Sequence, residues 1–230
     1  MMTQLGKVEK PEAEQFKQIK KLYLVPLIYA NEDATEEYKG KYSRYWQQVA
    51  EQLDNLESKA GKVHRVYHES ISQSGDEGIQ AVERLNPNSH QITKNKCEDG
   101  AVFEATEEHE LLEEVMDWER FLMLGCISEK VAHKVSEFYI EATKKRNESI
   151  TEKISQTLKD NEAGLLFIRE GHMVQFPSDI EVFSVFPPAL DEIQRWLRDH
   201  ADRLGKEEAA KETKKEIKKK TRKKVKKESR

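Results

Sequence analysis

The chain has 230 residues, of which 37% are hydrophobic and 36% are charged, and its net charge at pH 7 is −4. This charged fraction exceeds the roughly 25% of a typical globular protein and favours long exposed helix faces, while the length allows one core to form without disulfides or metals. The longest apolar run, at residues 22–30, is far shorter than the ~20 residues of a membrane span, and the N-terminus lacks the apolar segment of a secretion signal.

Residues 22–68 are predicted to form two strands joined by a helix. The segment LYLVPLIY (22–29) is apolar on both faces, which is typical of a buried strand, although Pro26 requires a free edge or a bulge. Apolar residues at steps of three and four predict a helix over residues 36–60. A second strand follows at 63–68, so the β-α-β order indicates parallel pairing.

The middle of the chain predicts three helices. The first covers residues 75–85, and residues 88–105 fit no single type of element. A helix at 107–125, capped by Thr106, carries an apolar stripe wide enough to predict that it is well buried. A longer helix follows at 129–160. The stripe of the 107–125 helix is made of Leu111, Val115, Trp118 and Leu122.

The C-terminal part returns to strands and ends in a helix. AGLLFI (163–168) predicts a strand near residues 164–169, a tight turn follows, and residues 173–176 are expected to return as the second arm of a hairpin. Another strand at 180–186 precedes a helix at 188–203 that opens on two prolines. Together these elements predict a helix-rich α/β fold with a mixed sheet of four or five strands and long amphipathic helices.

Charge and spacing divide the chain into three parts. Residues 1–20 are polar and are expected to be flexible, and residues 21–204, which no linker interrupts, are expected to form a single α/β domain. Residues 205–230 form a polybasic tail. Residues 206–230 hold eleven lysines, two arginines and five glutamates, a charge of +8, so the remainder of the chain carries −12.

Long stretches of the sequence resemble a prokaryotic protein family of unknown function. The stretches include EAGLLFIREGHMVQFPSDIEVFSVFPPALDEIQRWLR (162–198), RYWQQVAEQLDNLESKAGKVHRVYHE (44–69), MDWERFLM (116–123) and KVSEFYIEATKKR (134–146), and together with KLYLVPLI they span about residues 20–199. The layout of helix, strand and hairpin is also similar to that of archaeo-eukaryotic release-factor-like domains. That second likeness favours a role connected with translation and assigns no residue.

The sequence contains none of the common cofactor or metal motifs. It lacks GxGxxG, GxxxxGK[ST], GxSxG and HExxH, so we expect no cofactor and no metal. Cys97 and Cys126 do not form a CxxC pair, which favours a reducing compartment and a cytoplasmic location. Cys126 lies among apolar residues and is expected to be a small buried side chain.

Arg146 interrupts an apolar stripe, because it lies four residues after Ala142 and four before Ile150. A buried arginine must meet a carboxylate or a bound anion, since an unpaired buried charge is costly. The sequence therefore predicts that Arg146 is buried and contacts a carboxylate. Arg146 and Arg169 are also the candidates for anion binding.

The ends of the strands predict a possible catalytic site. In open α/β sheets, ligands bind beyond the carboxyl ends of parallel strands, where Asn31 and Glu32 would also lie. Histidine titrates near neutral pH, so a histidine and a carboxylate at this edge could transfer a proton. The candidates are His68, Glu69, Glu170 and His172. Solvated loop residues that have no catalytic role are the alternative.

Two functions from different classes follow from these observations. The first is a non-enzymatic interaction protein whose tail contacts RNA or a ribonucleoprotein, because lysine-rich runs bind polyanions by releasing counterions. The second is a small-molecule enzyme with its site at the strand ends. The tail could also serve only to keep the protein soluble. Its candidate contact residues are Lys218, Lys219, Lys220, Arg222, Lys223 and Lys224. The oligomeric state is left open.

Overall fold

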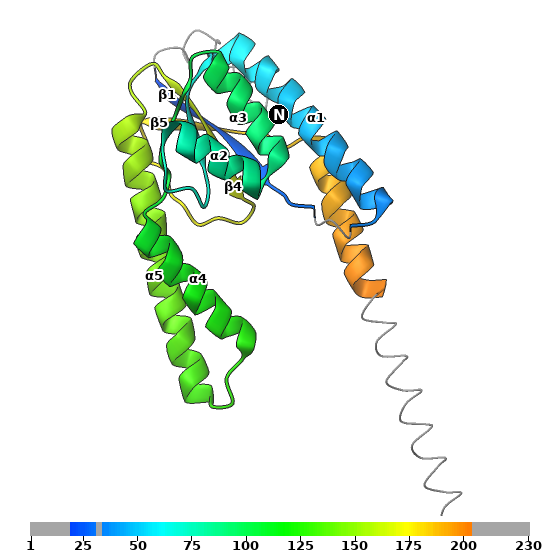
Figure 1. Ribbon diagram of the computed structural model, residues 1–230, viewed down its shortest axis with the longest axis vertical. Coiled ribbons are helices and arrows are strands. Elements are labelled where there is room, and N and C mark those ends of the chain that lie inside the picture. Colours follow the sequence, from blue (N-terminus) through cyan, green and yellow to red (C-terminus); the bar gives the residue numbers. More distant parts are fainter. Residues whose placement is uncertain (1–18, 31–33, 204–230) are drawn as a thin grey trace, which may run out of the picture. The chain divides into compact units, whose positions relative to one another are not determined.

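The computed structural model describes residues 19–30 and 34–203, which form an α/β fold with a five-stranded sheet (Figure 1). Residues 188–203 are helical. The strands are β1 Lys20–Leu27, β2 Val63–His68, β3 Val102–Phe103, β4 Ala163–Arg169 and β5 Ile180–Ser184. The labelled helices are α1 Glu36–Ala60, α2 Gly75–Leu85, α3 Pro87–Glu98, α4 His109–Leu124 and α5 Glu129–Thr157.

All strand pairs in the sheet are parallel, and the strand order is β3-β2-β4-β1-β5. The expected antiparallel hairpin is wrong, because residues 173–177 form no strand and β5 pairs in parallel with β1. The expected parallel neighbours are confirmed, since β4 lies between β1 and β2. The pairing of β1 with β5 ends at Leu24, so Pro26 lies beyond β5, where a missing N–H interrupts no ladder.

Alternating residues of the central strands fill two separate apolar layers. Leu22, Leu24 and Leu166 belong to a core cluster on the face covered by α5. The residues between them point to the other face, where Phe167 of β4 lies 6.2 Å from the ring of Trp46 in α1. Because helices cover both faces, both sets of side chains are buried, and the strands read as continuous apolar runs.

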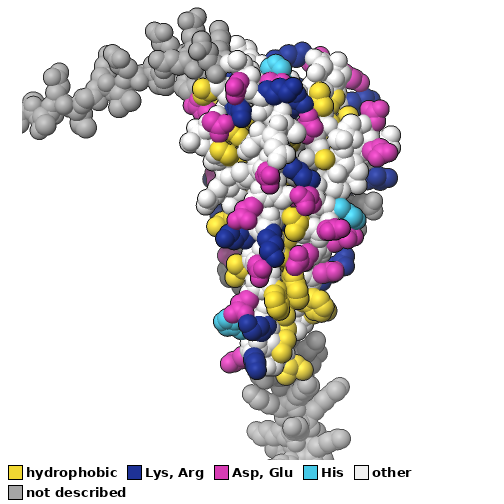
Figure 2. Space-filling view, turned by 90° about the vertical axis from the view of Figure 1, so that its left-hand side faces the viewer, with side chains coloured by type: hydrophobic (Ala, Val, Ile, Leu, Met, Phe, Trp, Pro, Cys, Tyr) yellow, Lys and Arg dark blue, Asp and Glu magenta, His cyan; other side chains and the backbone are white. Residues whose placement is uncertain are grey.

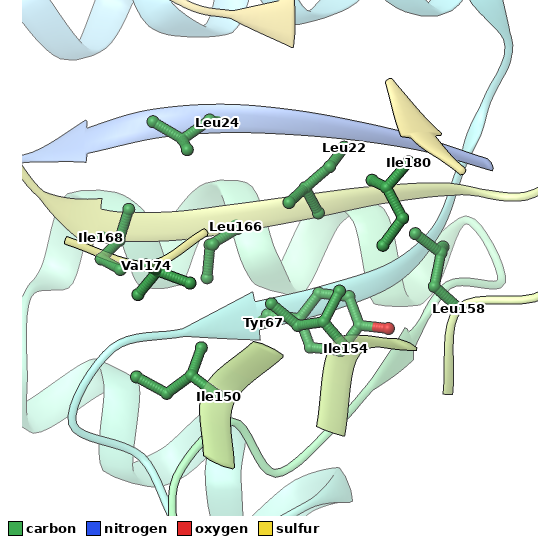
Figure 3. Packing of buried hydrophobic residues seen from close by; sticks show 10 residues of the cluster. All are labelled: Leu22, Leu24, Tyr67, Ile150, Ile154, Leu158, Leu166, Ile168, Val174 and Ile180. Atoms are coloured by element: carbon green, nitrogen blue, oxygen red, sulfur yellow. The ribbon is translucent and has the colours of Figure 1, made fainter. Parts of the chain in front are cut away.

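The core cluster ties the end of α5 to the sheet. Figure 3 shows Ile150, Ile154 and Leu158 beside side chains from β1, β2 and β4. Each of the three is at most 1% exposed, and full burial of such a side chain stabilises a protein by about 1.5–3 kcal/mol. Gly164 lets Tyr67 and Leu158 pack closely on β4, because a Cβ there would lie 3.0 Å from the ring of Tyr67 and 3.4 Å from Cδ1 of Leu158.

Helices α4 and α5 form an antiparallel hairpin that extends away from the sheet (Figure 1). The prediction of a well-buried α4 is wrong: Val115 is its one buried side chain, whereas Leu122 is 37% exposed and Leu124 81% exposed. The reason is that α4 packs chiefly on α5, beyond the layers of the sheet. The helix begins at His109, so Thr106 is not its cap, and Cys126 is exposed rather than buried.

The chain divides into two compact units. One contains the sheet and comprises residues 19–29 and 46–186 among those described, and the other comprises residues 30, 34–45 and 187–203. The smaller unit is held together by aromatic and ionic contacts. The ring of Tyr38 lies 5.1 Å from that of Trp196, and Arg44 forms a 3.1 Å ion pair with Glu192.

The predicted domain limits stay predictions. The flexible segment 1–20 lies almost entirely outside the described residues, as do Asn31, Glu32 and the polybasic tail. Among the helices that the structure describes, none has the length and apolar character needed to cross a membrane.

Candidate functional site

A cluster of four charges, of which Glu69, Glu107 and Arg146 are buried and Arg169 is exposed, joins the carboxyl ends of β2 and β4 to α5. Glu69, the first residue after β2, accepts hydrogen bonds from the backbone N–H of Arg169 at 2.6 Å and from its Nε at 2.5 Å. The Nη2 group of Arg146 on α5 donates to the same carboxylate at 3.0 Å. Because β2 and β4 are parallel neighbours, the residues at their ends meet at one edge of the sheet.

Glu107 completes the cluster from the loop before α4. Its two carboxylate oxygens accept from Nε and Nη2 of Arg146, both at 2.5 Å, which is the bidentate geometry of strong arginine–carboxylate pairs. One of these oxygens also accepts the backbone N–H of Ser70 at 2.6 Å. The prediction that Arg146 is buried and contacts a carboxylate is therefore confirmed.

The charges of the cluster stabilise one another. Burial acts to raise the pKa of Glu69, but the positive charge and hydrogen bonds of Arg169, with the charge of Arg146, hold it below its usual value. Burial acts to lower the pKa of Arg146, and the hydrogen bonds and negative charge of Glu107, followed by Glu69, outweigh it and raise that pKa. Glu69 and Arg146 therefore stay ionised, and the cluster places two carboxylates against two guanidinium groups.

A cavity of about 860 Å³ lies beside this cluster at the carboxyl edge of the sheet. Its walls are the part of α5 from Tyr139 to Glu152, the turn after β4, and Val115 of α4. Polar groups of the cluster and polar side chains of α5, among them Lys144, Asn147 and Glu148, share the lining with apolar side chains. The apolar lining residues are Val115, Tyr139, Ile140, Ile150, Ile168 and Met173.

Several polar groups on the cavity wall have bonding capacity left. Nδ1 of His172 and Oγ1 of Thr143 are buried and have no hydrogen-bond partner within the described part of the chain. Arg146 uses Nε and Nη2 in its ion pairs, and Arg169 uses only Nε. Nη1 of Arg146 and both terminal nitrogens of Arg169 therefore have no hydrogen-bond partner among the described residues and remain open to a ligand.

His68 lies in the core rather than on the cavity wall. Its Nδ1 is 2.7 Å from the carbonyl oxygen of Glu69, so this nitrogen donates, and Nε2 lies 3.0 Å from the hydroxyl of Ser89. Burial lowers the pKa of His68 to about 4, against the weaker opposing effect of Glu69. His68 is therefore a neutral structural side chain at physiological pH.

The predicted strand-end cluster is thus only partly assembled. Glu69 and His172 line the cavity, whereas His68 and Glu170 are not among its lining residues. Burial lowers the pKa of His172, and the negative charge of Glu69 opposes that shift. Of the two arginines proposed for anion binding, both line the cavity, but each already contacts a carboxylate.

Sequence reasoning missed two important residues of this region. Glu107 was expected in the first turn of a helix, but α4 begins two residues later and leaves its carboxylate free to pair with Arg146. Thr143 follows Tyr139 by four residues and precedes Arg146 by three. That helical spacing could have indicated that the three share a face.

Comparisons with known proteins give no relative for this chain. No protein-family model, no curated protein and no solved structure gives a significant match. Among residues 19–30 and 34–203, no group of three or more His, Cys, Asp or Glu side chains could hold a metal ion. The candidate site is therefore argued from its geometry alone.

Proposed function

We propose that the unit containing the sheet binds a small organic molecule that has an apolar body and a carboxylate head group. One observation supports this above the others: the 860 Å³ cavity combines apolar side chains in its lining with hydrogen-bonding groups that are still open. Its volume falls in the range of about 300–1,000 Å³ that small-molecule sites occupy. Its place beyond parallel strand ends is where ligands bind in open α/β sheets.

The chemistry of the open groups favours an acceptor as the head group. The terminal nitrogens of Arg146 and Arg169 can only donate, and the hydroxyl of Thr143 can donate as well. A carboxylate matches such donors with charge-assisted hydrogen bonds, each stabilising by roughly 1.5–3 kcal/mol. Because Glu69 and Glu107 already balance the two arginines, we expect a gain near the lower end of that range.

We favour binding over proton transfer at this site. The alternative, an enzyme with a His/Glu site, requires His68 to face the cavity, and that side chain is held in the core by Ser89 and the carbonyl of Glu69. Glu69 itself accepts three hydrogen bonds and has its pKa lowered, which makes it a weak base. Of the four catalytic candidates predicted from the sequence, His172 is the remaining one on the cavity wall.

The test is calorimetric titration of the full chain with 4-phenylbutyrate and with its neutral amide. The carboxylate should bind about tenfold more tightly, the ratio expected for one charge-assisted hydrogen bond. Arg169→Met should remove this preference. Thr143→Val, which deletes only the unpartnered hydroxyl, should weaken binding of the carboxylate while leaving the unfolding midpoint unchanged.

Two matched controls separate binding from folding. Thr93→Val also deletes a buried hydroxyl without a partner among the described residues, but it lies on α3 and outside the cavity lining. Arg65→Met removes another arginine that pairs with carboxylates, Glu104 and Glu162. Equal affinity for acid and amide, or equal effects of Thr93→Val and Thr143→Val, would contradict the proposal.

A second candidate function rests on the composition of the tail. We propose that residues 206–230, with eleven lysines and two arginines against five glutamates, contact RNA or a ribonucleoprotein in the cytoplasm. Lysine-rich runs bind phosphate backbones without reading sequence, and this run has no aromatic residue for base stacking. The rest of the chain is acidic and would repel a polyanion.

Deletion of residues 206–230 tests this second function. The truncated chain should lose RNA binding and keep its thermal midpoint. Binding by the full chain should be independent of sequence and should weaken steeply between about 50 and 200 mM salt. A truncated chain that binds RNA with an unchanged salt dependence would place the contact on the folded part instead.

A further inference from the structure

Residues 173–176 have the side-chain pattern of a strand but no strand partner. Met173 and Gln175 are exposed, whereas Val174 between them is 7% exposed and belongs to the core cluster (Figure 3). Phe176 packs against the same cluster. This alternation has the two-residue period of an extended chain. Within the described part of the chain, no backbone N–H or carbonyl of the segment pairs with another backbone group, so its edges are open.

One edge of this segment faces α5 across the cavity. The hydroxyl of Thr151 on α5 lies within hydrogen-bond distance, 3.0 Å, of the carbonyl oxygen of Gln175. In an extended chain, the backbone groups of every second residue point to the same edge, so those of Met173 are directed toward α5 as well. Met173 and Gln175 both line the cavity. The open N–H and carbonyl of Met173 therefore border it.

We infer that the ligand of the cavity is the C-terminal end of a short peptide, which adds as an antiparallel strand beside residues 173–175. The inference rests on the proposed function and deepens it, because it identifies the apolar body that carries the carboxylate. Arg146 and Arg169 offer open donors to the terminal carboxylate, and Met173 offers open backbone groups to the main chain. Peptides that bind exposed strand edges are held by such main-chain hydrogen bonds.

The positions of these groups determine the direction of the peptide. The segment leads away from Arg169, at the end of β4, toward the start of β5 at Ile180. A peptide whose carboxylate lies at Arg169 therefore runs in the opposite direction to the segment. In an antiparallel pair, two opposed residues can exchange both of their hydrogen bonds. Met173 would thus bind one peptide residue through its N–H and its carbonyl, and the two neighbouring peptide residues would turn their amides away.

The lining favours an apolar residue at the end of the peptide. Ile168 directly precedes Arg169, Ile150 lies about one helical turn after Arg146, and all four residues line the cavity. Figure 2, which views the side on which α5 lies in Figure 1, shows hydrophobic side chains mixed with acidic and basic ones. A peptide carries apolar side chains on a polar main chain, so it suits such surroundings better than a plain hydrocarbon chain does.

Calorimetric titration of the full chain with peptides tests the inference. The reference ligand is 4-phenylbutyrate, which has the carboxylate but no main chain. The N-acetylated pentapeptide Thr-Ser-Thr-Val-Leu, as the free acid, should bind about tenfold more tightly, because it adds two backbone hydrogen bonds. Its C-terminal amide should lose about tenfold in affinity. Decanoate serves as the plain hydrocarbon carboxylate and should bind more weakly than the peptide.

Methylation of the peptide tests the strand pairing without altering the protein. One methyl group is placed on each amide nitrogen in turn, which removes one donor at a time. Methylation of the residue opposite Met173 should weaken binding about tenfold. Methylation of either neighbouring amide should have little effect, because these amides point away from the segment. An equal loss at every amide, or no loss at any, would overturn the assigned pairing.

Two variants at one position test the same hydrogen bond from the side of the protein. Met173→Pro removes the side chain and the backbone N–H, whereas Met173→Ala removes the side chain and keeps the N–H. Met173→Pro should bind the peptide about tenfold more weakly than Met173→Ala. The two variants should bind 4-phenylbutyrate equally. Circular dichroism checks folding, and the methylated peptides decide the question should Met173→Pro fail to fold.

The outcomes separate this inference from the proposed function. If 4-phenylbutyrate binds in preference to its amide but the peptide binds no more tightly, the cavity is a carboxylate site and the peptide inference is wrong. If the acid and the amide of 4-phenylbutyrate bind equally, the proposed function fails, and the inference fails with it. Tighter binding of decanoate than of the peptide would assign the cavity to an alkyl chain, against our proposal.

Discussion

The two ends of α5 carry the same kind of apolar repeat in different surroundings. At the C-terminal end, Ile150 and Ile154 pack under the sheet and are at most 1% exposed. At the N-terminal end, Val131 and Phe138 belong to the same helical repeat, seven residues apart, and remain about half exposed. A helical repeat of apolar residues therefore indicates that a face is to be covered, but it does not identify what covers it.

Arg146 marks the boundary between these ends, and its replacement should have the largest effect. Arg146→Met should lower the free energy of unfolding by about 3–5 kcal/mol, because Glu69 and Glu107 would stay buried without their partner. Urea denaturation measures the change. Lys134→Met, which removes an exposed pair with Glu137 on the outer end, should leave the midpoint near that of the wild type. Similar losses of stability in Arg146→Met and Lys134→Met would contradict the difference between the buried and the exposed end of α5.

Two isoleucines on α5 allow the buried and the exposed end of the helix to be compared with the same residue type. Ile154→Ala should cost about 2–5 kcal/mol, because it leaves a cavity in the core. Ile140→Ala, at a side chain that is 66% exposed, should cost less than about 0.5 kcal/mol. Equal costs, measured by urea denaturation, would mean that the outer end is as well packed as the inner end.

His68 gives the core a dependence on pH that the outer end should lack. Its pKa falls from 6.5 to about 4 on folding, so the folded state binds this proton more weakly than the unfolded state. The stability it provides is full above pH 6.5 and is lost as pH falls toward 4, roughly 3 kcal/mol for this shift. In His68→Asn, the free energy of unfolding should depend less on pH between 6.5 and 4, as unfolding curves measured at several pH values would show. An unchanged pH profile in that variant would exclude His68 as the source.

Glu69 affects stability in a lower pH range than His68, so the two effects can be distinguished. Its pKa is lowered from 4.5, so its stabilising effect is present above that pH and is lost only as pH falls further. Loss of stability above pH 5 in His68→Asn would thus require another group.

The smallest effect concerns the two thiols. Cys126 in the hairpin turn is exposed, whereas burial, followed by the charge of Asp76, raises the pKa of half-buried Cys97. Iodoacetamide should therefore modify Cys126 first, as peptide mass analysis would reveal. Faster labelling of Cys97 would contradict the exposure of the turn.

The sequence by itself determined the fold class and most element positions. Continuous apolar runs at β1 and β4 indicated strands buried on both faces, and periodic stripes located α1 and α5. These signals are local, since they depend on the 3.6-residue and two-residue periods of helices and strands. The burial of Arg146 was also predictable, because a charge inside an apolar stripe must find a partner.

Tertiary structure alone decided which groups meet. The partners of Arg146 are Glu69 and Glu107, which lie 77 and 39 residues away along the chain, and the period of α5 holds no information about either. The same is true of His68, which the register of β2 directs to Ser89 rather than to the cavity. The all-parallel sheet likewise depended on where β5 pairs. Such pairings are set by long-range packing energies, which the local periodicity of a single sequence does not specify.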